Sequence, residues 1–300
     1  MKFLSRRKFL TNTSLASAGL IFYPDLSGST ERGSQEGEYN MLGKVGNYRK
    51  IDSYCTADPQ MDMVDKLGIE KMFVGKPMAW KEWTPEQFIA ANNEILGLMK
   101  KYPGKVVGQI SVNPQYGKES LEEINRCVGE GMVGTRLYYQ VKINDPLYYP
   151  VIEKLIDLKM IIFIHGEAQI GVGGYKMQYD VGRPPNISRP EDFVEAAERY
   201  PEAMFQFAHI GGGGDWEYMC KSFREFPNIY VDAGGSNNEE NMIDFAVECL
   251  GEDRIFFGTD NSYFQGVGKI LSSNLTERQK QKIFFDNYNS ILKKGGYHVN

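Results

Sequence analysis

The sequence predicts an α/β fold with a single (β/α)8 barrel of the TIM-barrel type. Short runs rich in β-branched and aromatic residues alternate with amphipathic stretches of helical period, and turn residues separate the two kinds. Eight such pairs fill about 250 residues, which is the usual length of this barrel. An open doubly wound sheet is less favoured, because no Gly-x-Gly-x-x-Gly motif follows the first strand.

Each predicted element follows from its local pattern. The strands are predicted over residues 49–54, 70–75, 105–112, 133–138, 160–165, 203–209, 228–233 and 254–260. The helices are predicted over residues 59–67, 85–101, 118–129, 147–158, 191–200, 215–225, 238–250 and 275–293. Thr84 precedes Pro85, and a capping hydroxyl before a first-turn proline indicates a helix start. The run Gly211–Gly214 allows a tight turn before the helix near Asp215.

Composition limits the kinds of partner. The 300 residues are 42% hydrophobic and 24% charged, which is enough for one large core. The net charge of −5 and the interspersed charges give no basic stripe, so we expect a small-molecule substrate and no nucleic-acid partner. Nothing in the sequence decides the oligomeric state, and a homo-oligomer stays open.

The amino terminus indicates export. Residues 1–27 contain Arg6-Arg7 and a mildly apolar stretch from Leu15 to Tyr23, and they resemble a twin-arginine signal, although a random basic start on a cytoplasmic protein stays open. The stretch is shorter than the ~20 residues that span a bilayer, so we expect no stable membrane anchor. Residues 28–47 are predicted to be a flexible leader and residues 48–300 the barrel. A periplasmic or exported location follows from this interpretation.

Imidazole and carboxylate groups recur at predicted strand ends. Two apolar runs end in His165 and His209, and a third ends in Asp260. The carboxyl ends of parallel barrel strands converge on one face, so these side chains predict a site there.

Five segments carry a family resemblance. They are Ile51-Asp52-Ser53, Phe163-Ile164-His165-Gly166, Ala208-His209-Ile210-Gly211-Gly212, Asp253–Asp260 and Phe285-Asp286-Asn287-Tyr288. With them the sequence resembles the amidohydrolase superfamily, in its branch related to aminocarboxymuconate semialdehyde decarboxylase. The resemblance implies that His165 and Asp260 correspond to metal ligands and that His209 corresponds to the acid/base histidine. It also implies two further metal-binding histidines on the first strand.

The first strand departs from that pattern. Tyr54 and Thr56 occupy the positions of the two histidines. Catalytic zinc normally has three protein ligands, so zinc or manganese held by His165 and Asp260 alone would be bound weakly. A divalent metal therefore stays open, and the further donors considered are Tyr54, Cys55, Asp52, Asp58 and Glu167.

A metal-free site is the alternative. His209 and Asp260 have the chemistry of a base and its partner, and Tyr54 could donate a proton. Three residues near the predicted mouth are candidates for binding the substrate, namely Arg136, Arg183 and Tyr138. Arginine pairs bidentately with carboxylates, which would favour an acidic substrate.

The predicted activity is therefore hydrolysis or decarboxylation of a small carboxylate-bearing or lactone-like molecule, with His209 as general acid/base. A second hypothesis is a non-catalytic ligand-binding barrel, a pseudoenzyme that lost catalysis with the strand-one histidines. A third is that both histidines are relics that are hydrogen-bonded in a filled barrel mouth.

Overall fold

The computed structural model describes residues 41–56, 59–78, 83–168 and 186–300. These residues belong to one unit, Met41–Asn300. The predicted signal, Asp58 and Arg183 lie outside the described residues.

The described strands form the predicted barrel. They are β1 (Ile51–Thr56), β2 (Lys71–Gly75), β3 (Val106–Gly108), β4 (Thr135–Leu137), β5 (Ile162–His165), β6 (Phe205–Ala208), β7 (Ile229–Asp232) and β8 (Ile255–Phe256). Neighbouring strands pair in parallel in the orders β1-β2-β3 and β4-β5-β6-β7-β8. A bridge between Ile110 and Thr135 joins the first group to β4. On the other side the backbone N–H of Ser53 donates to the Phe257 carbonyl over 2.9 Å, which links β1 to the segment after β8.

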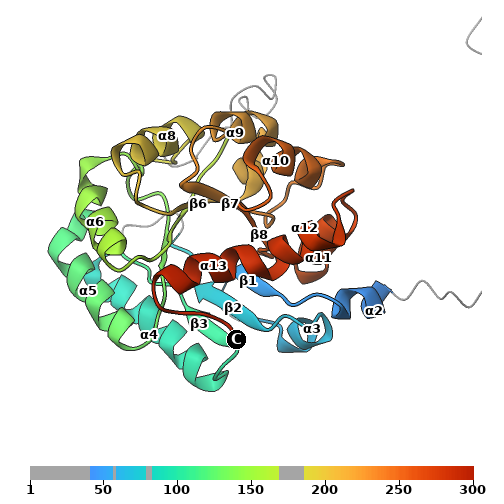
Figure 1. Cartoon of the computed structure of the whole chain (residues 1–300). Coiled ribbons are helices and arrows are strands. Elements are labelled where there is room, and N and C mark those ends of the chain that lie inside the picture. The colour runs from blue at the N-terminus through green and yellow to red at the C-terminus, as the bar shows by residue number, and fades with distance from the viewer. Residues whose placement is uncertain (1–40, 57–58, 79–82, 169–185) are drawn as a thin grey trace, which may run out of the picture. The chain divides into compact units, whose positions relative to one another are not determined.

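Helices surround this ring of strands (Figure 1). They are α2 (Met41–Gly46), α3 (Met61–Lys66), α4 (Pro85–Lys101), α5 (Gly117–Gly129), α6 (Tyr149–Asp157), α8 (Pro190–Arg199), α9 (Trp216–Ser222), α10 (Met242–Leu250), α11 (Tyr263–Leu271), α12 (Glu277–Gln281) and α13 (Asn287–Lys294). A π-helical turn over Lys282–Asp286 joins α12 to α13. Helix α4 begins after Thr84 as predicted, and the Thr84 backbone N–H donates to Gln87 Oε1 over 3.0 Å, which is the Gln87 half of a capping box.

Two α-helices of the described residues, α2 and α11, lie outside the ranges in which the sequence predicts helices. Helix α11 was not predicted. Helix α2 lies within the predicted flexible leader, so the ordered unit begins at Met41 instead of residue 48. Two contacts explain this order. The Val45 side chain is buried against the barrel. The buried Lys50 ammonium donates hydrogen bonds to the carbonyls of Val45 and Tyr48, over 2.5 and 2.7 Å.

The amino-terminal end of the barrel is filled by apolar side chains. Residues from the strand starts, such as Ile51 and Phe73, pack in one cluster with Tyr288 and Leu292 of α13. The rings of Phe73 and Tyr288 meet edge to face, with centroids 4.8 Å apart. Figure 1 shows α13 lying across this end of the ring. Functional groups are thereby confined to the opposite, carboxyl-terminal end of the strands.

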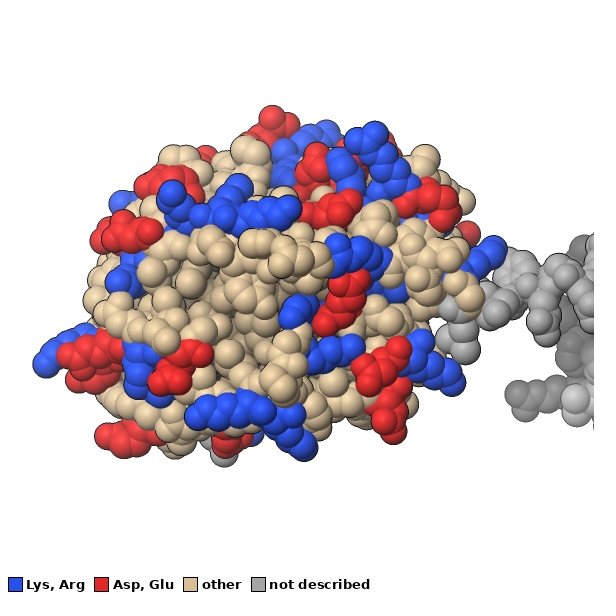
Figure 2. All heavy atoms as spheres, turned by 60° about the horizontal axis from the view of Figure 1, so that its bottom comes forward, with Lys and Arg blue, Asp and Glu red and all other residues tan. Residues whose placement is uncertain are grey.

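The surface and the cysteines agree with the composition. On the face drawn in Figure 2, basic and acidic side chains are intermixed around an uncharged centre. All four cysteines, Cys55, Cys127, Cys220 and Cys249, are free and buried. In the described part of the chain, no helix is both long enough and apolar enough to cross a membrane.

Candidate active site

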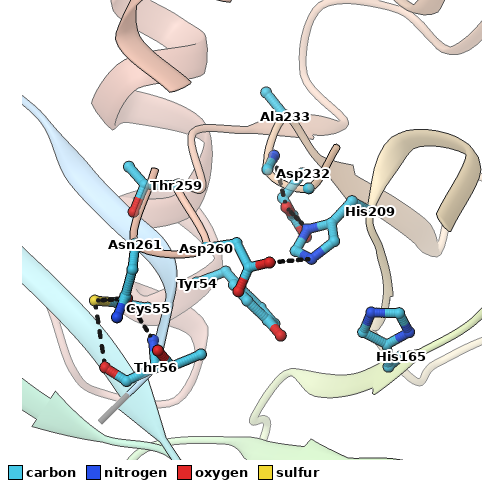
Figure 3. A network of polar contacts seen from close by, with 12 residues as sticks. Tyr54, Cys55, Thr56, His165, His209, Asp232, Ala233, Thr259, Asp260 and Asn261 are labelled. Atoms are coloured by element: carbon cyan, nitrogen blue, oxygen red, sulfur yellow. Dashed lines mark hydrogen bonds and ion pairs between the residues drawn. The ribbon is translucent and has the colours of Figure 1, made fainter. Parts of the chain in front are cut away.

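The side chains predicted from the strand ends do gather at the carboxyl-terminal face of the barrel. His165 ends β5 and His209 follows β6, and their rings lie 5.5 Å apart. The ring of Tyr54, from β1, meets the His209 ring edge to face at 4.4 Å. Asp260 approaches from the segment after β8, with Oδ2 3.8 Å from His209 Nε2 (Figure 3).

His209 is held by a carboxylate that the sequence analysis did not name. Its Nδ1 lies 2.5 Å from Oδ1 of Asp232, the last residue of β7. Asp232 is fully buried and also accepts hydrogen bonds from Gly234 N (2.9 Å) and Gln206 Nε2 (3.0 Å). Burial alone would raise the pKa of this carboxyl, but His209 and these donors outweigh burial and lower it. Asp232 is therefore ionised, and Nδ1 of His209 carries the proton that it donates.

The other nitrogen of His209 faces the site. Nε2 is buried and has no hydrogen-bond partner among the described residues. With the proton on Nδ1, the Nε2 lone pair is directed toward Asp260 (Figure 3). This is the geometry of a general base whose tautomer is fixed by a buried carboxylate.

The loop after β7 is shaped to accommodate this imidazole. A Cβ added at Gly235, whose φ is +72°, would lie 2.7 Å from Cδ2 of His209. The Lys269 ammonium, from α11, donates to the carbonyls of Ala233, Gly234 and Gly235 over 3.1, 3.2 and 2.8 Å. Helix α11 thus holds the loop against the histidine.

Asp260 sits at the edge of the site. Its side chain is 37% exposed, and its backbone is left-handed, with φ of 48°. The conformation is fixed by the Asp260 N–H, which donates to the Tyr54 carbonyl over 3.0 Å. Desolvation raises the pKa of this carboxyl, against the opposing charge of Arg136. Asp260 is therefore a partly exposed carboxyl at the edge of the site, next to His209.

Two tyrosines from β1 and the segment after β4 line the wall. The Tyr54 hydroxyl lies 3.2 Å from that of Tyr138. Burial raises the pKa of Tyr54 well above its usual value, so the phenol stays protonated and can donate a hydrogen bond.

His165 is neutral. Its Nδ1 lies 2.5 Å from the Tyr139 hydroxyl, and its ring stacks on Tyr138 at 5.8 Å. Desolvation lowers the pKa of His165 to about 3, and the fixed positive charge of Arg136 lowers it further. This side chain is suited to hydrogen bonding with a substrate and not to carrying positive charge.

Arg136, on β4, is fully buried beneath these aromatic residues. Its guanidinium lies 3.8 Å from the centre of the Tyr54 ring. Nε donates to the Tyr138 hydroxyl over 3.2 Å, and Nη1 donates to the carbonyls of Cys55 and Gly75. Its Nη2 has no partner among the described residues.

The donors considered for a metal are mostly engaged elsewhere. Asp52 accepts hydrogen bonds from the backbone of Tyr54 and from both the N–H and the hydroxyl of Thr259. The Cys55 thiol contacts Asn261 Oδ1 at 2.9 Å, and burial raises the pKa of that thiol. Tyr54 is a neutral phenol. Within the described ranges, no three or more His, Cys, Asp or Glu side chains cluster in a way that could hold a metal ion. The described donor set therefore does not fit a divalent metal, since His165 and Asp260 gain no third ligand.

Comparisons with known proteins agree with this fold. A family model described as amidohydrolase matches residues 53–287. The 2-amino-3-carboxymuconate-6-semialdehyde decarboxylase of Dictyostelium discoideum is 22% identical over 269 residues, which cover 78% of this chain and 74% of that protein.

Solved structures share the barrel. The 2,6-dihydroxybenzoate decarboxylase from Rhizobium superimposes with a TM-score of 0.68 at 16% identity, over 82% of this chain and 99% of that one. A dihydroxybenzoic acid decarboxylase from Polaromonas sp. JS666, with bound manganese and the inhibitor 2-nitroresorcinol, gives a TM-score of 0.65 at 18% identity, over 82% and 97%. At these identities the structures establish the likeness of fold.

Proposed function

This chain belongs to the amidohydrolase family, and from that premise we propose that it is a hydrolase or decarboxylase of a small carboxylate-bearing or lactone-like molecule. The observation that carries the proposal is the Asp232–His209 pair, because Nε2 of His209 has no hydrogen-bond partner among the described residues and lies 3.8 Å from Oδ2 of Asp260. A relic histidine that is hydrogen-bonded in a filled mouth would have both ring nitrogens paired, whereas Nε2 of His209 has no hydrogen-bond partner among the described residues.

The same nitrogen serves either reaction. In hydrolysis Nε2 takes a proton from water as the water oxygen bonds to the carbonyl carbon, and it returns that proton to the leaving group as the carbonyl–leaving-group bond breaks. In decarboxylation Nε2 first takes up a proton from solvent; the carbon–carboxylate bond then breaks, CO2 leaves, and Nε2 gives that proton to the carbon that keeps the electron pair. The relatives named as decarboxylases support the second reaction.

Other residues have supporting roles in this proposal. Tyr54 and Tyr138 present hydroxyl groups to a substrate carbonyl or carboxylate, and His165 orients it from the opposite side. Asp260 exchanges protons with solvent at the mouth. Tyr138 and Arg136 are proposed to bind the substrate, as the sequence predicted. A substrate-binding role for Arg183 stays a prediction, because Arg183 lies outside the described residues.

The test is a screen of aromatic and β-keto acids, lactones and amides, followed by substitution of the histidine. We expect His209→Asn to lower kcat by about 10²- to 10⁴-fold, the typical contribution of a general acid or base. His298→Asn is the matched control, because His298 is the remaining histidine and is exposed near the carboxyl terminus. Ligand binding without turnover in the unmodified protein would instead support a non-catalytic barrel.

We further propose that the protein is exported through its twin-arginine-type amino terminus. Arg6 and Arg7, followed by the apolar stretch from Leu15 to Tyr23, support this. Cell fractionation is expected to find the protein in the periplasm and to find the Arg6→Lys, Arg7→Lys variant retained in the cytoplasm. Equal distribution of the two would contradict export by this route.

A further inference from the structure

The interior of the barrel contains an arginine without an acidic partner. Arg136 is fully buried, yet no described carboxylate lies within ion-pair distance of its guanidinium; its partners are the Tyr138 hydroxyl and the carbonyls of Cys55 and Gly75. A buried charge with only neutral partners is costly, and proteins normally offset it with a counter-charge. The guanidinium remains charged in proteins, so an anion that enters the barrel mouth would offset this cost.

The fold makes specific room for this side chain. A Cβ added at Gly75, at the end of β2, would lie 2.4 Å from Cδ of Arg136. Only glycine at this position lets the arginine stem pass toward the centre of the barrel. The guanidinium then stacks on the Tyr54 ring, which occupies the position where the family resemblance places a metal-binding histidine.

The guanidinium lies among the candidate catalytic groups. It lies over the Tyr54 ring, and its positive charge acts to lower the pKa of both His165 and Asp260. These are the two residues that the resemblance assigns to a metal. A divalent cation at the same place would be repelled by this fixed charge in a region of low dielectric. The lack of a third ligand among the described residues and the buried positive charge of Arg136 both disfavour a divalent metal at this site.

We propose that Arg136 provides the fixed positive charge of this site in place of a divalent metal, and that it binds the carboxylate of the substrate through Nη2. The inference rests on the proposed function, because it assumes that a carboxylate-bearing molecule enters the barrel mouth. Charge-assisted hydrogen bonds from arginine to a carboxylate are short and strong, and Nη2 is the guanidinium nitrogen that has no hydrogen-bond partner among the described residues.

Metal binding tests the first half of the proposal. Mn²⁺ would be titrated into the wild-type protein, into the Tyr54→His, Thr56→His variant, and into that variant with Arg136→Met or Arg136→Lys added. We expect no stoichiometric Mn²⁺ in the wild type and weak binding in the double variant. Removing the charge with Arg136→Met should tighten Mn²⁺ binding by at least about 100-fold, whereas Arg136→Lys should not.

Two results would overturn this half. One is a wild-type protein that retains one Mn²⁺ per chain after dialysis. The other is a double variant that binds Mn²⁺ as tightly as the triple variant with Arg136→Met. Circular dichroism and thermal unfolding of each variant separate an effect on the site from loss of the fold, and Arg136→Lys covers the case in which Arg136→Met does not fold.

Carboxylate binding tests the second half. We would measure binding of 2,6-dihydroxybenzoate and of resorcinol, which lacks the carboxylate, by calorimetry in the presence of EDTA. The carboxylate compound should bind the wild type more tightly than resorcinol does, and Arg136→Met should weaken that binding by about 10- to 100-fold. Arg49→Met is the matched control, because Arg49 pairs with Glu70 at the surface.

The outcomes separate this inference from the proposed function. Binding of 2,6-dihydroxybenzoate that requires added Mn²⁺, or no preference for it over resorcinol, would overturn the inference and leave the acid/base role of His209 intact. Carboxylate binding without metal, together with unchanged turnover in His209→Asn, would overturn the acid/base role of His209 and leave the inference about Arg136 intact.

Discussion

At the scale of single residues, Asp232 determines what His209 can do. It receives the Nδ1 proton over 2.5 Å and is itself fixed by Gly234 N and Gln206 Nε2. Without an acceptor at Nδ1, the imidazole could adopt the other tautomer and place its proton on Nε2, where the lone pair is needed. Asp232 is a positioning residue, because it acts on the substrate through the histidine.

Replacing the Asp232 carboxylate should therefore impair catalysis while His209 remains in the site. We expect Asp232→Asn to lower kcat by about 10²- to 10⁴-fold and to change the pH profile of kcat/KM. The profile is the informative measurement, because a purely structural defect would lower activity at all pH values alike. Asp215→Asn is the control, since Asp215 undergoes the same chemical change but caps α9. An unchanged pH profile in Asp232→Asn would contradict the assignment.

Asp52 predicts a dependence of stability on pH. Burial raises the pKa of this carboxyl to about 7, although three hydrogen bonds from Tyr54 and Thr259 oppose the shift. In the unfolded chain its pKa is about 3.9. Between these values the folded state holds a proton that the unfolded state lacks. The free energy of unfolding should therefore fall as pH rises from about 4 to 7, by an amount on the order of 1–3 kcal/mol.

Urea unfolding of the wild type and of Asp52→Asn across this pH range tests the assignment. The variant should lose most of the slope, because its side chain does not titrate. Asp65→Asn, at an exposed position paired with Lys105, should keep it. Parallel slopes for the wild type and Asp52→Asn would show that another group is responsible.

Some site residues could be identified from the sequence because a local pattern indicates them, and others could not because no such pattern exists. His165, His209 and Asp260 end conspicuous apolar runs, and the structure brings them together. Asp232 ends the apolar run Ile229–Asp232 in the same way, so the strand-end pattern could have identified it. The burial of Arg136 had no local signal, because it depends on the space left by Gly75, which is distant in sequence.

At the scale of elements, the contact between β2 and β4 decides the position of the guanidinium. Gly75→Ala would place a methyl group 2.4 Å from Arg136 Cδ. We expect this variant to fold, because the stem of the arginine can move, and to lose carboxylate binding as Arg136→Met does. Calorimetry with 2,6-dihydroxybenzoate measures the effect.

Gly97→Ala provides the comparison. Gly97 lies inside α4 with nothing within 4 Å of an added Cβ, so alanine there should leave binding unchanged. It should also stabilise the protein by about 1 kcal/mol through helix propensity. Unchanged carboxylate binding in Gly75→Ala would show that the position of Arg136 does not depend on this glycine.

Element prediction succeeded where periodicity was strong and failed where packing overrides propensity. The eight strands were found because their apolar runs are bounded by turns. Helix α11 was missed because it contains Gly266 and Gly268, and glycine disfavours helices. Gly266 is nevertheless well placed, since an added Cβ would lie 3.2 Å from the Gly258 carbonyl behind β8. Helix α2 was missed because its stability comes from Val45 and Lys50, which pack on the barrel.

At the scale of the whole molecule, the barrel separates stability from chemistry. Apolar side chains and α13 fill its amino-terminal end, whereas the buried polar groups of the site lie at the other end. This division is why the fold could be predicted from hydrophobic pattern alone. The chemistry could be predicted only in part, because it depends on a few side chains whose partners come from distant strands.

The burial of all four thiols has a practical consequence for following the molecule as it opens. A thiol reagent such as Ellman's can reach Cys55, Cys127, Cys220 or Cys249 only after the surrounding packing separates. We expect no labelling of the native protein on the timescale of minutes and complete labelling in denaturant. Rapid modification of any one thiol in the native protein would contradict the burial. The cysteines are thus built-in reporters, and their distribution around the ring would tell which sector of the barrel comes apart first.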